Sequence, residues 1–135
     1  MDGVSLTSLK KIFNQNGDIF HAMKCEDYGY EGFGEAYFSS ISKNSVKGWK
    51  KHTRMTLNIV VPIGEIKFVV YDEKDKEFFS IILSQENYQR LTVRPGYWMA
   101  FSGIGENNML LNLASIQHDP KEVISVNLDK ILYDW

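Results

Sequence analysis

The sequence predicts an all-β fold, either a sandwich or a barrel, from three observations. Short aromatic and β-branched segments recur about every ten residues, which is typical of strands in such folds. Glycine, proline, asparagine or aspartate separates one segment from the next. No segment carries a helical apolar stripe for more than one or two turns. The chain has 135 residues, 44% of them hydrophobic, which is a common size and composition for one domain, so we expect residues 1–135 to form a single domain.

The first 35 residues are expected to form an N-terminal arm and the first strands. Residues 5–18 fit either a short helical turn or an extended arm. Asn14, Asn16 and Gly17 mark a turn, because these residue types adopt turn conformations readily. Residues 20–24 fit a short strand, and residues 26–34, with three glycines, fit a loop.

Strand patterns dominate the rest of the chain. Pro62 and Gly64 break the run "TLNIVVPIGEIKFVVYD" into two strands, which we expect to pair as an antiparallel hairpin. Turns are expected at residues 72–77 and at Pro95-Gly96. The expected strands are residues 35–41, 56–61, 65–72, 78–83, 90–93, 97–101, 108–114, 123–128 and 130–135.

The stretch "VKGWKKHTRMTLNIVV" places a cationic run before an apolar strand. If residues 50–58 are extended, side chains alternate along the strand, and one face then carries Lys50, His52, Arg54, Thr56 and Asn58. In a small barrel such a polar row can line an interior cavity. In an open antiparallel sheet the same row would face solvent.

Composition restricts the partners and the compartment. The formal net charge of -2 gives no reason to expect nucleic acid or an anionic membrane as a partner. Cys25 is the single cysteine, so no intramolecular disulfide can form, which fits a reducing compartment. The N-terminus has no secretory signal pattern and no apolar run reaches membrane-span length. We therefore expect a cytoplasmic protein.

The order of several motifs resembles the sugar-epimerase branch of the cupins, which includes dTDP-4-dehydrorhamnose 3,5-epimerase and the related nucleotide-sugar 3,4-ketoisomerases. The likeness runs from about Leu9 to Trp135. The motifs, in order, are "NQNGDIFHAM", "FGEAYFSSI", "KGWKKH", "PIGEIKFVVYD", "LSQENYQRLTVRPGYWMAF", "HDP" and "LDKILYDW". "KGWKKH" is similar to the Arg-Gly-Leu-His-x-Gln of the epimerases and to the Gly-Phe-His-x-His of the ketoisomerases.

The resemblance implies a cupin jelly roll (a double-stranded β-helix), a homodimer, and a nucleotide-activated 4-keto-6-deoxy sugar bound inside the barrel. It also implies epimerisation or keto-isomerisation next to the ketone, in the synthesis of cell-surface polysaccharide such as lipopolysaccharide. This chemistry needs a base, an acid and positive charge near the enolate oxygen. It needs no metal and no redox cofactor.

The chain departs from the epimerase pattern at the catalytic positions. Lys50 stands where the epimerases have their histidine, and His52 coincides with the second histidine of the ketoisomerases. The epimerase lysine and tyrosine fall near Leu57 and Asn112, and Lys47 replaces a phosphate-binding arginine. A metal-binding cupin would need a histidine in place of Lys50, so no metal is expected.

His52 is the first choice for the catalytic base, because an ordinary histidine titrates at about 6.5 and neighbouring lysines favour its neutral form. Lys50 is expected to stabilise an enolate or a phosphate, and Lys47 to bind diphosphate. The other expected substrate-binding residues are Asn58, Tyr71, Arg90 and Asn112. The alternative is a cupin that binds a nucleotide sugar or sugar intermediate without turning it over.

Overall fold

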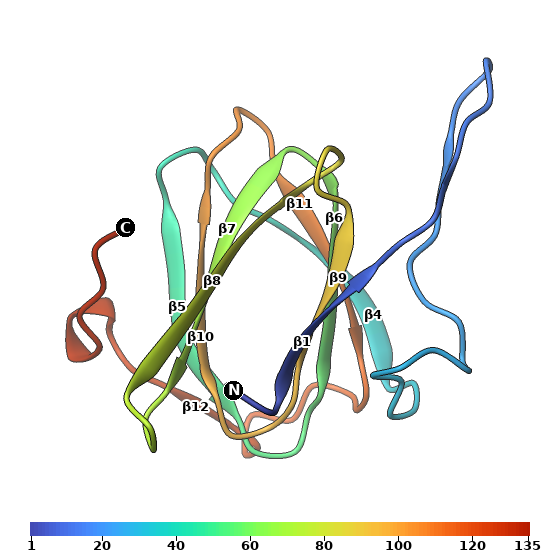
Figure 1. Ribbon diagram of the computed structural model, residues 1–135. Coiled ribbons are helices and arrows are strands. Elements are labelled where there is room, and N and C mark those ends of the chain that lie inside the picture. The colour runs from blue at the N-terminus through green and yellow to red at the C-terminus, as the bar shows by residue number, and fades with distance from the viewer.

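Two five-stranded antiparallel sheets face each other and form the body of the protein, as the computed structural model of residues 1–135 shows (Figure 1). The all-β prediction is therefore confirmed. The first sheet has the order β1 (Val4–Ser8), β9 (Gln89–Val93), β6 (Leu57–Ile63), β11 (Met109–Ala114) and β4 (Glu35–Ser40). The second has the order β12 (Val123–Ser125), β5 (Val46–His52), β10 (Trp98–Gly103), β7 (Glu65–Asp72) and β8 (Glu77–Ser84). The chain contains no helix with the length and hydropathy needed to span a membrane.

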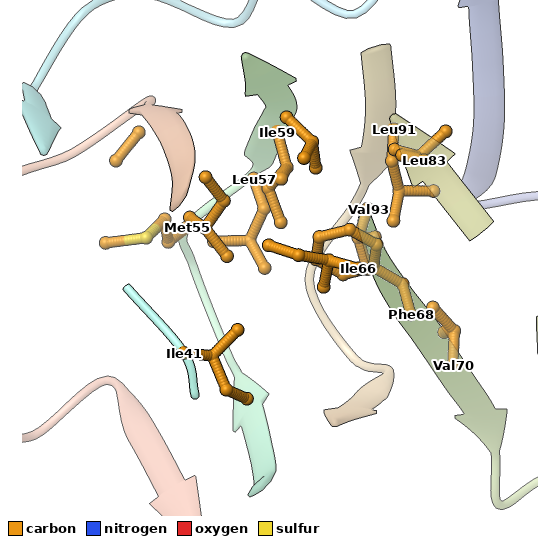
Figure 2. Close-up of a cluster of buried hydrophobic side chains, with 13 residues drawn as sticks. Ile41, Met55, Leu57, Ile59, Ile66, Phe68, Val70, Leu83, Leu91 and Val93 are labelled. Carbon is orange, nitrogen blue, oxygen red and sulfur yellow. The ribbon is translucent and has the colours of Figure 1, made fainter. Parts of the chain in front are cut away.

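The hydrophobic core lies between the two sheets (Figure 2). Leu57 and Ile59 of β6 and Ile66 and Phe68 of β7 are all at most 4% exposed. They alternate with residues on the other side of each strand, as the period of two requires. Full burial of each such side chain stabilises the fold by about 1.5–3 kcal/mol.

The expected hairpin of β6 with β7 is wrong, because these two strands lie in different sheets. At the turn between them, Gly64 has a φ of +81°, and an added Cβ would lie 2.1 Å from the carbonyl oxygen of Asn107. This sharp turn carries the chain from one sheet to the other. The hairpin that does form joins β7 to β8, with Asp72 paired with Glu77.

The N-terminal residues form an extended arm, not a helical turn. After β1, which pairs with β9, the strands β2 (Lys11–Ile12) and β3 (Ile19–Phe20) form a small hairpin. The expected turn is confirmed, because the N–H of Gly17 donates to the carbonyl of Asn14. Figure 1 shows this hairpin, in blue, extending away from the sheets.

The C-terminal segment packs on the outer side of the second sheet, beside β5 (Figure 1). Residues 130–135 are not the expected strand. Lys130 is the last residue of a 3-10 helix, η1 (Leu128–Lys130), and residues 131–135 follow it without regular structure. The indole N–H of the fully buried Trp49 donates to the carbonyl of Ile131 at 3.2 Å, and the ammonium of Lys67 lies 4.9 Å from the ring centre of Tyr133. These contacts hold the end of the chain against the outer face of the second sheet, at β5 and β7.

Candidate functional site

A cavity of about 390 Å³ lies inside the barrel, with its wall built by strands of both sheets. Its volume falls within the range of small-molecule binding sites, about 300–1,000 Å³. The lining residues are Tyr37, Ser39, Lys47, Gly48, Lys50, His52, Leu57, Ile59, Met99, Phe101, Leu110 and Asn112. An apolar floor therefore carries a few polar and cationic groups, which is the usual composition of a ligand site.

Strand β5 supplies the charged wall of this cavity. The register against β10 shifts between the pairs Met99↔Lys50 and Phe101↔Lys47, so β5 has one more residue than β10 over this interval. Such a bulge changes the alternation of side chains, and Lys47 and Lys50 both line the cavity although they are three residues apart. The ammonium of Lys47 donates to the carbonyl of Ser40 at 2.6 Å. Lys50 has no carboxylate within salt-bridge distance, so its charge is available to a bound anion.

His52 lies at the end of β5, beside a buried glutamate. Its Nδ1 contacts Oε1 of Glu122, a residue that is 2% exposed. Oε2 of Glu122 accepts the backbone N–H groups of Thr53, Arg54 and Met55 at 3.1–3.2 Å. Burial acts to raise the pKa of Glu122, but the hydrogen bonds from His52 and the backbone outweigh it and hold the pKa below its ordinary value. Glu122 is therefore a carboxylate at neutral pH.

Tyr37 and Asn112 form a second polar pair in the cavity wall. Oδ1 of Asn112 accepts the backbone N–H of Asn58 at 3.1 Å, which leaves Nδ2 to donate to the hydroxyl of Tyr37 at 2.9 Å. The phenolic oxygen of Tyr37 thus accepts from Asn112, and its own proton is free to donate elsewhere. Tyr37 lies on β4 and His52 on β5, so the two groups belong to different sheets.

A second hollow of about 350 Å³ adjoins the cavity and shares Tyr37, Lys50 and His52 with it. We call this hollow the vestibule. It is also lined by Glu35 and His118, and the carboxylate of Glu35 accepts the backbone N–H of His118 at 2.7 Å. The shared residues stand where the two hollows meet, so a ligand that extends from one to the other would pass them.

The structure brings together four of the seven expected site residues, namely Lys47, Lys50, His52 and Asn112. Asn58, Arg90 and Tyr71 do not line the cavity. The side chain of Asn58 points to the outer face of its sheet, where it donates to the carbonyl of Gly29 at 2.9 Å.

Arg90 is also directed to the outer side of its sheet. Its guanidinium is fully buried and donates to the carbonyls of Ala22 and Tyr28. Tyr71 packs 4.6 Å from the ring of Phe78, beside the C-terminal segment. Asn58, Arg90 and Tyr71 are outside the cavity for the same reason. On each strand, the alternation of side chains directs the residue to the outer surface of its sheet.

The single polar face expected from Lys50 to Asn58 is also wrong. Strand β5 ends at His52, and the chain crosses to the other sheet before β6 begins at Leu57. Arg54, in the crossing, is exposed and pairs with Asp119 at 2.7 Å. Three of the four backbone N–H groups in this crossing, those of residues 53–55, donate to Glu122, a residue that the sequence pattern did not single out. Tyr37 was missed too, although the alternation in "EAYFSS" places it on one face with Ser39.

No group of three or more histidine, cysteine, aspartate or glutamate side chains could hold a metal ion. An imidazole, an unpaired ammonium and a phenolic hydroxyl border a mostly apolar chamber. These are the groups needed to remove a proton beside a carbonyl and to stabilise the resulting anion.

Comparison with known proteins gives a consistent result. The model of the FdtA family, described as WxcM-like, C-terminal, matches residues 2–129. A dTDP sugar isomerase from Desulfovibrio desulfuricans G20 is 29% identical with a TM-score of 0.93, and the match covers 99% of this chain and 91% of that one. A search of curated proteins gave no match.

Two further solved structures share the fold. A mutant of the 3,4-ketoisomerase QdtA from Thermoanaerobacterium thermosaccharolyticum, in complex with TDP-4-keto-6-deoxyglucose, is 21% identical with a TM-score of 0.82; the match covers 97% of this chain and 92% of that one. The epimerase RmlC from Legionella pneumophila, in complex with dTDP-4-keto-L-rhamnose, is 17% identical with a TM-score of 0.87, covering 100% and 79%. The predicted cupin fold of the sugar-epimerase branch is thus confirmed.

Proposed function

The chain belongs to the FdtA family (WxcM-like, C-terminal), and on that premise we propose that it is an isomerase acting next to the ketone of a dTDP-linked 4-keto-6-deoxy sugar. One observation carries the proposal. His52, the one imidazole of the main cavity, lies two residues from the unpaired Lys50 on the same wall. A base and a cation placed together in this way suit the formation of an enediolate.

The proposed reaction is 3,4-keto-isomerisation. His52 accepts the proton from C3 through Nε2, and the electron pair moves so that the C4 oxygen becomes an enediolate oxygen. Lys50 stabilises that negative charge. The imidazolium then returns the proton to C4, while the proton of the C3 hydroxyl is transferred to the C4 oxygen and C3 becomes the ketone. We assign the relay of the proton between the two oxygens to Tyr37, because its hydroxyl lines the cavity and its proton has no acceptor. We propose that no metal or redox cofactor takes part.

The main cavity holds a single imidazole, that of His52, and this favours keto-isomerisation over epimerisation; His118 lines only the vestibule. In keto-isomerisation one base can carry a proton between adjacent carbons on one face of the sugar. Epimerisation removes a proton from one face and adds one to the opposite face, and so needs two groups on opposite walls. Tyr37 is the candidate for the second group, so epimerisation is the alternative reaction of the same site.

A binding module that does not turn its ligand over is the second candidate function. It is favoured by Lys50, Leu57 and Asn112, which occupy the positions of the epimerase histidine, lysine and tyrosine. Under either function the ligand is a nucleotide sugar, with Lys47 and Lys50 near its diphosphate or its ketone.

The test is incubation with dTDP-4-keto-6-deoxyglucose in deuterated water, followed by NMR and mass spectrometry. Deuterium at C3 or C4 together with a 3-keto product is expected for the parent protein. His52→Asn should slow exchange by about a hundredfold to ten-thousandfold and leave dTDP binding nearly unchanged. Exchange as fast in the variant as in the parent would exclude His52 as the base. If dTDP raises the melting temperature but no tested sugar exchanges, the binding module is the correct function.

We further propose a homodimer. The β2–β3 hairpin extends away from the sheets (Figure 1), and it exposes Phe13 (82%) and Ile19 (56%). A second copy of the chain would cover these apolar side chains. We also propose that the chain is one domain, that it works in the cytoplasm, and that its product serves cell-surface polysaccharide synthesis, including lipopolysaccharide. The unpaired, exposed Cys25 supports the reducing compartment. Sedimentation of the purified protein tests the dimer.

A further inference from the structure

Glu122 divides its two carboxylate oxygens between two tasks. Oε2 accepts all three backbone N–H groups of the crossing at residues 53–55. Oε1 has His52 as its one hydrogen-bonding partner. One carboxylate oxygen is therefore enough to accept the hydrogen bonds of residues 53–55. The other oxygen is not needed to keep this part of the backbone in place.

We propose that Glu122 is a positioning residue that keeps the proton of neutral His52 on Nδ1 and presents a bare Nε2 to the cavity, an inference that rests on the proposed function. An ionised carboxylate has no proton to donate. An imidazole nitrogen that contacts it must therefore carry the hydrogen, and in the neutral ring the other nitrogen is then the acceptor. After proton abstraction the same carboxylate stabilises the imidazolium.

The local fold places Glu122 against the strand that carries the base. Val123 pairs with His52 where β12 meets β5, and the carbonyl of Glu122 accepts the backbone N–H and the hydroxyl of Thr53, each at 2.8 Å. Farther along, the backbones of Val126 and Trp49 exchange two hydrogen bonds. The pairing of β12 with β5 therefore fixes the carboxylate of Glu122 beside the imidazole, on the side away from the cavity.

Glu122→Gln makes this inference testable, because glutamine has nearly the same shape and one oxygen. The amide oxygen can still accept the N–H groups of residues 53–55. The amide nitrogen then faces Nδ1 of His52 and donates to it, which forces the imidazole proton onto Nε2. The fold is retained but the tautomer is reversed. Glu122→Asp, which keeps a carboxylate on a shorter side chain, is the matched control.

The experiment is ¹⁵N NMR of the histidine side chains in the resting protein, combined with steady-state kinetics on dTDP-4-keto-6-deoxyglucose. We expect the Nδ1-H tautomer in the parent and in Glu122→Asp, and the Nε2-H tautomer in Glu122→Gln. Turnover by Glu122→Gln should fall about a hundredfold or more with little change in KM, and Glu122→Asp should recover part of it.

An Nε2-H tautomer in the parent protein would overturn the inference. So would a Glu122→Gln variant that is folded and slow but keeps the parent tautomer, because Glu122 would then act only on the fold. If Glu122→Gln does not fold, the tautomer of His52 in the spectra of the parent and of Glu122→Asp decides whether the inference holds. The spectra need no substrate, so a parent protein without turnover would refute the proposed function and leave the tautomer result standing.

Discussion

Replacing Arg90 with methionine should lower the free energy of unfolding by about 2–4 kcal/mol without weakening nucleotide binding. Arg90 is fully buried, and its guanidinium donates to the carbonyl of Ala22 at 2.7 Å and to that of Tyr28 at 3.0 Å. A longer contact of 3.4 Å reaches the carboxylate of Asp27. These bonds fasten the segment between β3 and β4 to the outer face of β9, away from the cavity.

The magnitude follows from these contacts. A hydrogen bond to a charged group contributes about 1.5–3 kcal/mol, so the two carbonyl bonds together contribute about 3–6 kcal/mol. Burial works against them: it lowers the pKa of Arg90, with partial compensation from Asp27, and Nε has no partner. Methionine removes that cost of burial and fills a similar volume. Asp27 is 24% exposed on its side chain and can be hydrated after the change, so the net loss is about 2–4 kcal/mol.

Urea unfolding followed by tryptophan fluorescence gives the stability, and the shift of the melting temperature by dTDP gives binding. Arg94→Met is the matched control, because Arg94 contacts the same segment through Glu31 at 2.6 Å but is 34% exposed on its side chain. Its loss should cost less than about 1 kcal/mol. The reasoning is refuted if Arg90→Met unfolds at the same urea concentration as the parent but loses its response to dTDP, since Arg90 would then contact the ligand.

Two further predictions concern the cavity and the buried carboxylate. Lys47→Ala should reduce the rise in melting temperature that dTDP causes, because a ligand that binds only the folded state stabilises it; equal rises in variant and parent would remove Lys47 from the site. The folded-state pKa of Glu122 lies below its ordinary value, so its stabilisation is complete above about pH 4.3, where the unfolded chain titrates, and is lost as the pH falls through the folded pKa. Acid unfolding curves should show this loss for the parent and not for Glu122→Gln.

Alternation along strands predicted much of the fold, but it could not predict which strands pair. The segments at residues 57–63 and 65–72 were both recognised as strands, and a turn was expected at Gly64. The alternation of apolar residues and the presence of glycine or proline do not distinguish a hairpin from a turn that passes between sheets. Both need two strands joined by residues that can adopt a tight turn. The two cases are distinguished only by the packing of the core. Here the two strands lie in opposite sheets and bury their apolar faces against each other.

The candidate site was predictable to the extent that it lies on one strand. Lys50 and His52 share a face two residues apart, and the structure keeps them together. Glu122 lies 70 residues beyond His52, in a turn with no periodic pattern, so nothing local indicated it. Arg90 and Asn58 were misplaced because a polar residue within an apolar strand fits either face, and here covering segments satisfy them on the outer side.

Comparing variants of Lys50 and Lys51 can distinguish a specific role in the cavity from a general effect of positive charge. Lys50 lines the cavity without a carboxylate partner, whereas Lys51 pairs with Glu73 and lies 4.8 Å from the ring centre of Trp98, on the other side of β5. Alternate residues on a strand are roughly 6–7 Å apart, and both side chains line the same cavity wall, so under the proposed function one sugar ring lying against this wall would contact both groups. In the proposed reaction the imidazole acts on a C–H bond and the ammonium acts on the adjacent oxygen.

Lys50→Met should therefore lower turnover of dTDP-4-keto-6-deoxyglucose by about a hundredfold to a thousandfold, the usual loss when one group that stabilises a transition-state oxyanion is removed. Lys51→Met changes the net charge equally and should leave turnover within about threefold of the parent, because the Lys51 ammonium points away from the cavity and is paired with Glu73. The comparison uses initial rates at saturating sugar, with dTDP binding measured in parallel. If Lys50→Met loses binding and turnover in the same proportion, the ammonium holds the diphosphate instead of the enediolate oxygen. If both variants lose turnover equally, the effect is general electrostatics, and Lys50 has no specific place in the reaction.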